Sequence, residues 1–135
     1  MALSRSEAKP GEEFRAGKAG ERSSWIPRDV VVVDGGGSVV PLNMGCIGIC
    51  AAIAIHISND RVAGRYVAEP SIIPSDPRDI TMYETLDQIT SVMDKVREAL
   101  VFELASDVTK RVKPDLLIID GPLIPYSALA NMTDN

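Results

Sequence analysis

The sequence predicts an α/β protein built on a mixed sheet, with three antiparallel strands, a long crossover helix and a fourth strand parallel to the first. Two segments, 30–33 and 116–119, are continuous runs of Val, Ile and Leu, which are typical of strands buried on both faces. Between them, segment 83–111 carries apolar residues at helical spacing. Because parallel strands need a long connection, this order predicts that the second run returns beside the first.

The composition indicates a single globular domain. The chain has 135 residues, of which 45% are apolar and 24% charged, with a net charge of −5. That charge argues against binding nucleic acid through bulk electrostatics, but it is compatible with a nuclease whose basic groups are local. No secretory signal precedes residue 30, and the longest apolar stretch, 44–57, is too short to cross a bilayer. Cys46 and Cys50 lie too far apart on one strand for a disulfide, so we expect a cytoplasmic protein without membrane contact.

The first half of the chain predicts a polar arm followed by a hairpin. Residues 1–24 predict a flexible arm, and residues 25–135 predict the domain. The first strand is expected over 29–34, ending in a glycine turn at 35–37. The second strand, expected over 45–58, alternates large odd with small even positions. This alternation predicts one face under a helix, and the small face is suited to close approach by another layer or subunit.

The second half predicts one more strand of the meander and then the crossover. A turn at 58–60 predicts an antiparallel strand over 61–69, and the prolines of 70–77 predict a connection that is neither helix nor central strand. The helix is expected from about residue 83 to 111, with Asp79 or Thr81 as its cap. The fourth strand is expected over 116–120.

Acidic residues are the candidate site. Asp34 and Asp120 each follow a buried strand, so a parallel arrangement predicts that both reach one edge of the sheet. On the helix, Glu103 falls at the edge of the apolar stripe and Asp107 near its middle, four residues apart. Three carboxylates around one point suit Mg²⁺ or Mn²⁺. The alternatives are that each Asp-Gly is only a turn, and that the helix acids overhang the sheet and face water.

This order of elements is that of a ribonuclease-H-like fold, and its motifs resemble a known family. Asp34-Gly35-Gly36 after a strand, a helical Glu103, and Asp120-Gly121-Pro122-Leu123 after the crossover are similar to the NurA nuclease domain. The resemblance implies that Asp34, Glu103 and Asp120 are catalytic manganese ligands, with Asp107 as the alternative third ligand. It also implies a homodimeric DNA nuclease, a 5′→3′ exonuclease and single-strand endonuclease. Such enzymes work with the hexameric HerA translocase in DNA end resection and repair, mainly in archaea.

Two features depart from the family pattern. Pro122 stands where the family has Ser, and family members continue well past the second Asp motif, so the domain is expected to be incomplete at its C-terminus. The second hypothesis is therefore a non-catalytic NurA-like module that dimerises or docks on a translocase. A third hypothesis takes the glycines after Asp34 as the phosphate-binding loop of an actin-like ATPase. His56 is expected to be structural or at the surface, rather than a metal ligand or base.

Overall fold

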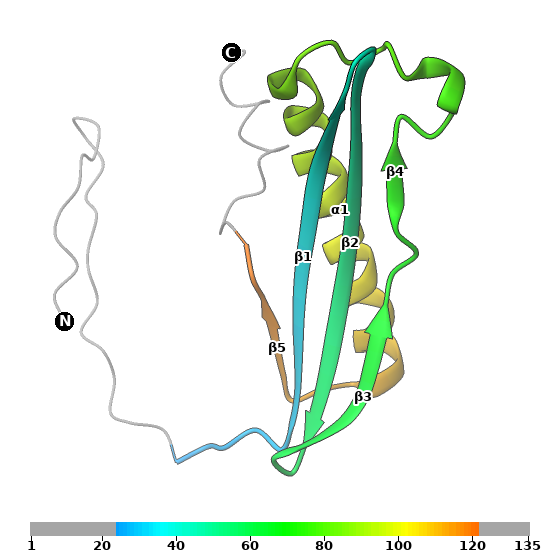
Figure 1. Cartoon of the computed structure of the whole chain (residues 1–135). Coiled ribbons are helices and arrows are strands. Elements are labelled where there is room, and N and C mark those ends of the chain that lie inside the picture. Colours follow the sequence, from blue (N-terminus) through cyan, green and yellow to red (C-terminus); the bar gives the residue numbers. More distant parts are fainter. Residues whose placement is uncertain (1–23, 122–135) are drawn as a thin grey trace, which may run out of the picture.

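A computed structural model describes residues 24–121 of the chain (Figure 1). The predicted arm, apart from Ser24, and the segment that follows Gly121 lie outside the described residues. The elements in chain order are β1 (Asp29–Leu42), β2 (Gly45–Ser58), β3 (Arg61–Val67), β4 (Ser71–Ile73), a 3₁₀ helix (Pro77–Asp79), α1 (Leu86–Val112) and β5 (Leu116–Ile119).

The sheet has the predicted mixed topology. Its strand order is β3-β2-β1-β5, and β4 pairs with β2 beyond the end of β3. β1 and β2 run antiparallel over 14 residue pairs, and β5 runs parallel to β1 over four. Helix α1 crosses one side of the sheet between β3 and β5, as Figure 1 shows. The predicted α/β class and the parallel return of the last strand are confirmed.

β1 is much longer than the sequence predicted. The glycines at 35–37 do not form a turn, because they continue the strand and pair with Ala52, Ala51 and Cys50 of β2. The chain reverses at Asn43 and Met44 instead. The next residue, Gly45, has φ of 157°, and a Cβ there would overlap the backbone of Ile80. The prediction of a glycine turn after Asp34 is therefore wrong.

The glycines and other small residues let α1 lie close to the sheet. A Cβ at Gly48 would lie 2.5 Å from Met93 Sδ, and one at Gly37 would lie 2.8 Å from Met93 Cε. The even positions of β2 face the helix and are buried, and Cys50 and Ala54 are fully inaccessible. The small face thus approaches a second layer, as predicted, and that layer is α1. Both cysteines are free and buried.

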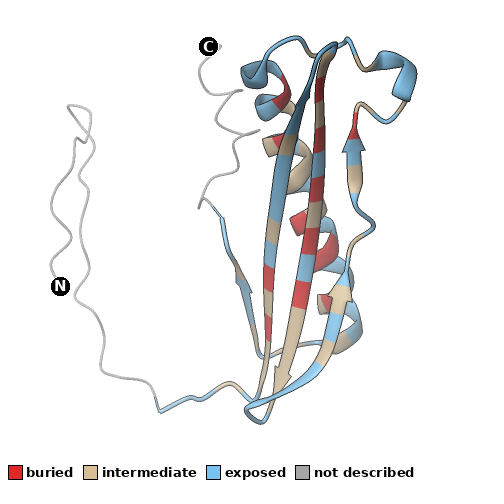
Figure 2. Cartoon of the chain, in the orientation of Figure 1, coloured by how far each residue is buried: buried red, intermediate tan, exposed pale blue. Residues whose placement is uncertain are grey.

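The opposite side of the sheet is mostly apolar and is uncovered by any described element. Val31 and Val33 of β1 are fully buried under α1, so the pleat turns Val32 and Asp34 to the other side. Figure 2 shows buried residues alternating with exposed or intermediate ones along β1 and β2. We call this surface the isoleucine face; its large exposed members are Ile49, Ile53, Val62, Val67, Ile72 and Ile118.

Helix α1 begins at a cap that the sequence analysis did not choose. Thr85 Oγ1 accepts a hydrogen bond from Gln88 N, and the Gln88 side chain accepts one from Thr85 N, which forms a capping box. Asp79, a predicted cap, lies in the 3₁₀ helix instead. The helix ends at Val112, and the residue after it, Lys113, adopts a left-handed conformation before Pro114.

Candidate functional site

Asp34 and Asp120 lie side by side on neighbouring parallel strands. The last residue pair between β1 and β5 joins Val33 to Ile119, and Asp120 N donates a hydrogen bond to Val33 O at 3.0 Å. Asp34 follows Val33 and Asp120 follows Ile119, so the backbones of the two aspartates are about 4.8 Å apart, the spacing of adjacent strands. Val33 and Ile119 both pack against the core under α1. The pleat therefore places both aspartates on the isoleucine face.

The two aspartates are exposed to solvent. Asp34 Oδ1 accepts a hydrogen bond from Gly35 N at 2.7 Å, which fixes the carboxylate against its own strand. Neither aspartate has an ion pair within residues 24–121. Like charges directly opposite each other on neighbouring strands destabilise a sheet. A cation bound by both carboxylates would remove this repulsion.

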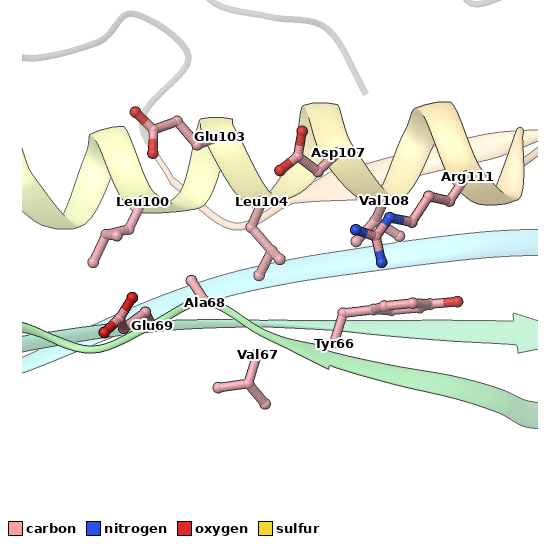
Figure 3. Close-up of a pocket in the computed structure, with 10 residues that line it drawn as sticks. All are labelled: Tyr66, Val67, Ala68, Glu69, Leu100, Glu103, Leu104, Asp107, Val108 and Arg111. Carbon is pink, nitrogen blue, oxygen red and sulfur yellow. The ribbon is translucent and has the colours of Figure 1, made fainter.

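Glu103 and Asp107 do not join the two aspartates. Both project from α1, and α1 covers the side of the sheet that Asp34 and Asp120 do not occupy. Glu103 and Asp107 are exposed, and in Figure 3 Glu103 projects from the side of the helix away from the strands. Of the two interpretations that the sequence left open for Glu103 and Asp107, the structure supports the one in which both acids face water.

The helix acids border a groove between α1 and β3. Its volume is about 400 Å³. Leu104 and Val108 point from α1 toward the strands, while Tyr66 and Glu69 line the opposite wall (Figure 3). The sequence analysis missed this groove, because no pattern within β3 or α1 indicates that the two elements pack side by side. Across residues 24–121, no three His, Cys, Asp or Glu side chains are arranged to hold a metal ion.

His56 has a structural role, as expected. Its Nε2 lies 2.8 Å from Asp29 Oδ1, and only 15% of its side chain is exposed. The hydrogen bond from His56 is the main reason why the pKa of Asp29 is lowered from its usual value. Asp115, just before β5, accepts hydrogen bonds from the backbone N–H groups of Arg28 and Asp29. These contacts join the ends of β1, β2 and β5 far from Asp34.

The chemistry of the aspartate pair fits a hard divalent cation. Mg²⁺ commonly binds proteins through one or two carboxylates and keeps several waters or substrate oxygens. Asp34 and Asp120 supply two such carboxylates on one exposed surface. The third predicted ligand does not fit, because neither Glu103 nor Asp107 reaches this surface.

These elements define a mixed α/β fold of the ribonuclease-H-like class, in which a meander, a crossover helix and a parallel strand follow each other. Among solved structures, the chain is similar to the NurA nuclease from Sulfolobus solfataricus, with a TM-score of 0.50 and 21% sequence identity. The match covers 70% of this chain and 26% of that one, so the chain corresponds to about a quarter of the NurA structure. No family model and no curated protein matches the chain. The chain thus has a NurA-like fold.

Between residues 24 and 121, no helix is both long enough and apolar enough to cross a membrane.

Proposed function

We propose that the chain is a divalent-metal-dependent DNA nuclease, or the metal-binding part of one. The observation that supports this most directly is the adjacency of Asp34 and Asp120 on the parallel strand pair β1 and β5. The NurA-like fold supports the choice of phosphodiester hydrolysis over other metal chemistries. By the same resemblance, we propose DNA end processing with a HerA-type translocase as the setting.

The roles of the chain's own residues follow from their positions. The carboxylates of Asp34 and Asp120 would hold Mn²⁺ or Mg²⁺, and the hydrogen bond from Gly35 N would orient the Asp34 carboxylate. The bound metal would activate water and stabilise charge on the phosphate oxygens. Because Glu103 and Asp107 lie across the sheet, we propose that they are not ligands. The remaining coordination positions would be filled by water and by phosphate oxygens.

A second candidate function is a non-catalytic interaction module. The observation that favours it is the isoleucine face, where Ile72 and Val67 are 55% and 66% exposed. Contiguous exposed apolar surface of this kind marks interaction sites in folded proteins. In this alternative the two aspartates would bind no metal; Asp34 would be a solvent-facing residue within β1, and Asp120 would end β5.

The test is a calorimetric titration with Mn²⁺ of the wild type and two matched variants. Asp34→Asn keeps the oxygen that accepts from Gly35 N but removes the charge, so we expect it to abolish saturable binding without loss of fold. Glu103→Gln makes the same chemical change across the sheet, and we expect binding within about twofold of wild type. Cleavage of single-stranded and 5′-ended duplex DNA is then measured on the same three proteins. A well-folded wild type that binds no Mn²⁺ would refute the nuclease and leave the interaction module.

A further inference from the structure

We infer that Arg65 binds the phosphate next to the one held at the aspartate pair, so that one polynucleotide strand spans both groups. The inference rests on the proposed function, because it assigns a second contact with the same substrate. It starts from the register of the sheet. Arg65 of β3 pairs with Ile55 of β2, so its side chain lies on the isoleucine face, where Asp34 and Asp120 also lie.

Arg65 is the isolated cation of this face. The other strand residues that the structure describes on this side of the sheet are aliphatic, glycine, serine or acidic. The Arg65 side chain is exposed and makes no ion pair within residues 24–121. Because the chain has a net charge of −5, a basic group that attracts nucleic acid has to act locally. Arg65 is such a group, and it lies on the same surface as the aspartate pair.

The distance between Arg65 and the aspartate pair suits two contacts on one strand. Arg65 is level with Ile55 and hence with Val32, which is two residues from Asp34 along β1. Two residues give about 7 Å along the strands and two strand spacings give about 9.6 Å across them, so the Cα atoms of Arg65 and Asp34 are about 12 Å apart. An extended arginine side chain spans about 6 Å. The remaining gap is too long for a direct ion pair and is comparable with the spacing of successive phosphates in an extended strand.

The two contacts have complementary chemistry. A carboxylate repels a phosphate, so Asp34 and Asp120 hold one only through a bound cation. A guanidinium binds phosphate directly, through two parallel N–H···O hydrogen bonds. The surface between the two groups is formed by aliphatic side chains such as Ile53 and Ile55, against which the sugar and base of the intervening nucleotide pack. Arg65 therefore contributes to binding of a polynucleotide and not to binding of the metal.

The experiment measures the affinity of the full chain for a fluorescent single-stranded phosphorothioate oligonucleotide, by anisotropy in Mn²⁺ at several salt concentrations. The phosphorothioate keeps the backbone charges and slows cleavage. Each phosphate contact on a single strand contributes about 0.7 to the slope of the logarithm of the binding constant against that of the salt concentration. We expect Arg65→Gln to reduce the slope by about 0.7 and to weaken binding about tenfold. Arg65→Lys keeps the charge, so it should retain the wild-type slope with a smaller loss of affinity.

The matched control is Arg61→Gln, which removes the same charge from the same strand. Arg61 pairs with Ser58, an even position of β2, and the even positions face α1. Arg61 therefore lies on the other side of the sheet, and we expect its variant to keep the wild-type slope. Calorimetric titration with Mn²⁺ provides the second measurement, and Arg65→Gln should bind the ion as the wild type does. Since both arginines are exposed, all variants should fold, which circular dichroism checks.

The outcomes separate this inference from the proposed function. A slope that Arg65→Gln leaves unchanged, an equal decrease in Arg65→Gln and Arg61→Gln, or a folded wild type that binds no oligonucleotide would each overturn the inference. Loss of Mn²⁺ binding in a folded Arg65→Gln would also overturn it, because Arg65 would then act on the metal site. A wild type that binds no Mn²⁺ refutes the proposed function instead, and the salt slope still decides whether Arg65 contacts phosphate.

Discussion

The glycine run of β1 provides a sharp test of the fold, because adjacent glycines face opposite sides of the sheet. At Gly35 an added Cβ would overlap Val101 Cγ2 and lie 3.2 Å from Arg97 Cγ, both on α1. At Gly36 an added Cβ would meet nothing within 4 Å. Alanine at the two positions is therefore the same chemical change with opposite steric consequences.

The expected effects on the free energy of unfolding have opposite signs. Overpacking beneath α1 should make Gly35→Ala less stable by about 1–3 kcal/mol. Gly36→Ala should be more stable by about 0.4–1 kcal/mol, because it loses less backbone entropy on folding. The free energies of unfolding of the two variants should therefore differ by about 1.4 kcal/mol at least.

Urea denaturation at one fixed protein concentration, followed by circular dichroism, measures both variants. A fixed concentration matters because self-association contributes to apparent stability. Equal destabilisation by both alanines would refute the strand, since a glycine turn would be sensitive at each position. Equal tolerance would refute the close approach of α1 to the sheet.

Two further predictions concern pH and the helix cap. The pKa of Asp29 is lowered, mainly by its hydrogen bond with His56. The contribution of Asp29 to stability is therefore fully present above about pH 3.8 and is lost as the pH falls through the lowered pKa of the folded state. Urea midpoints should therefore fall for Asp29→Asn at about pH 6, and the difference from wild type should shrink near pH 3; a constant difference would contradict the linkage. Thr85→Ala removes the oxygen that accepts from Gln88 N and should cost about 1 kcal/mol in the same assay. Thr81→Ala, outside the helix, should change stability by less than about 0.5 kcal/mol, and an equal cost at both positions would place the cap elsewhere.

Much of the fold was predictable because its signals are local. The alternation of β2 predicted both its bounds and its buried small face, and the long helix before a second apolar run predicted the parallel return of β5. The adjacency of Asp34 and Asp120 followed from that topology. The spacing of Thr85 and Gln88 also indicates the capping box, although the sequence analysis predicts Asp79 or Thr81 as the cap.

The rest depends on contacts between elements that are distant in the sequence. Glycine after a strand favours a turn unless something packs against it. Val101 packs against Gly35 from 66 residues further on, and Met93 packs against Gly37 from 56 residues further on. The prediction that Glu103 lies beside Asp34 and Asp120 is wrong for a related reason. β1 is apolar on both sides over residues 30–33, so the sequence does not indicate which side of the sheet α1 covers. It therefore does not indicate whether the helix acids lie on the same side of the sheet as Asp34.

The two sides of β2 have a consequence for how the chain selects its register. In most half-buried strands, a slip by one residue is penalised because polar side chains would enter the core. Here both sides of β2 are apolar, so polarity does not discriminate between the correct pairing and the slipped one. Volume does: a slip would force isoleucines such as Ile47 and Ile49 into the space that Gly48 leaves for Met93. The register of this hairpin is therefore selected by steric exclusion rather than by amphipathicity.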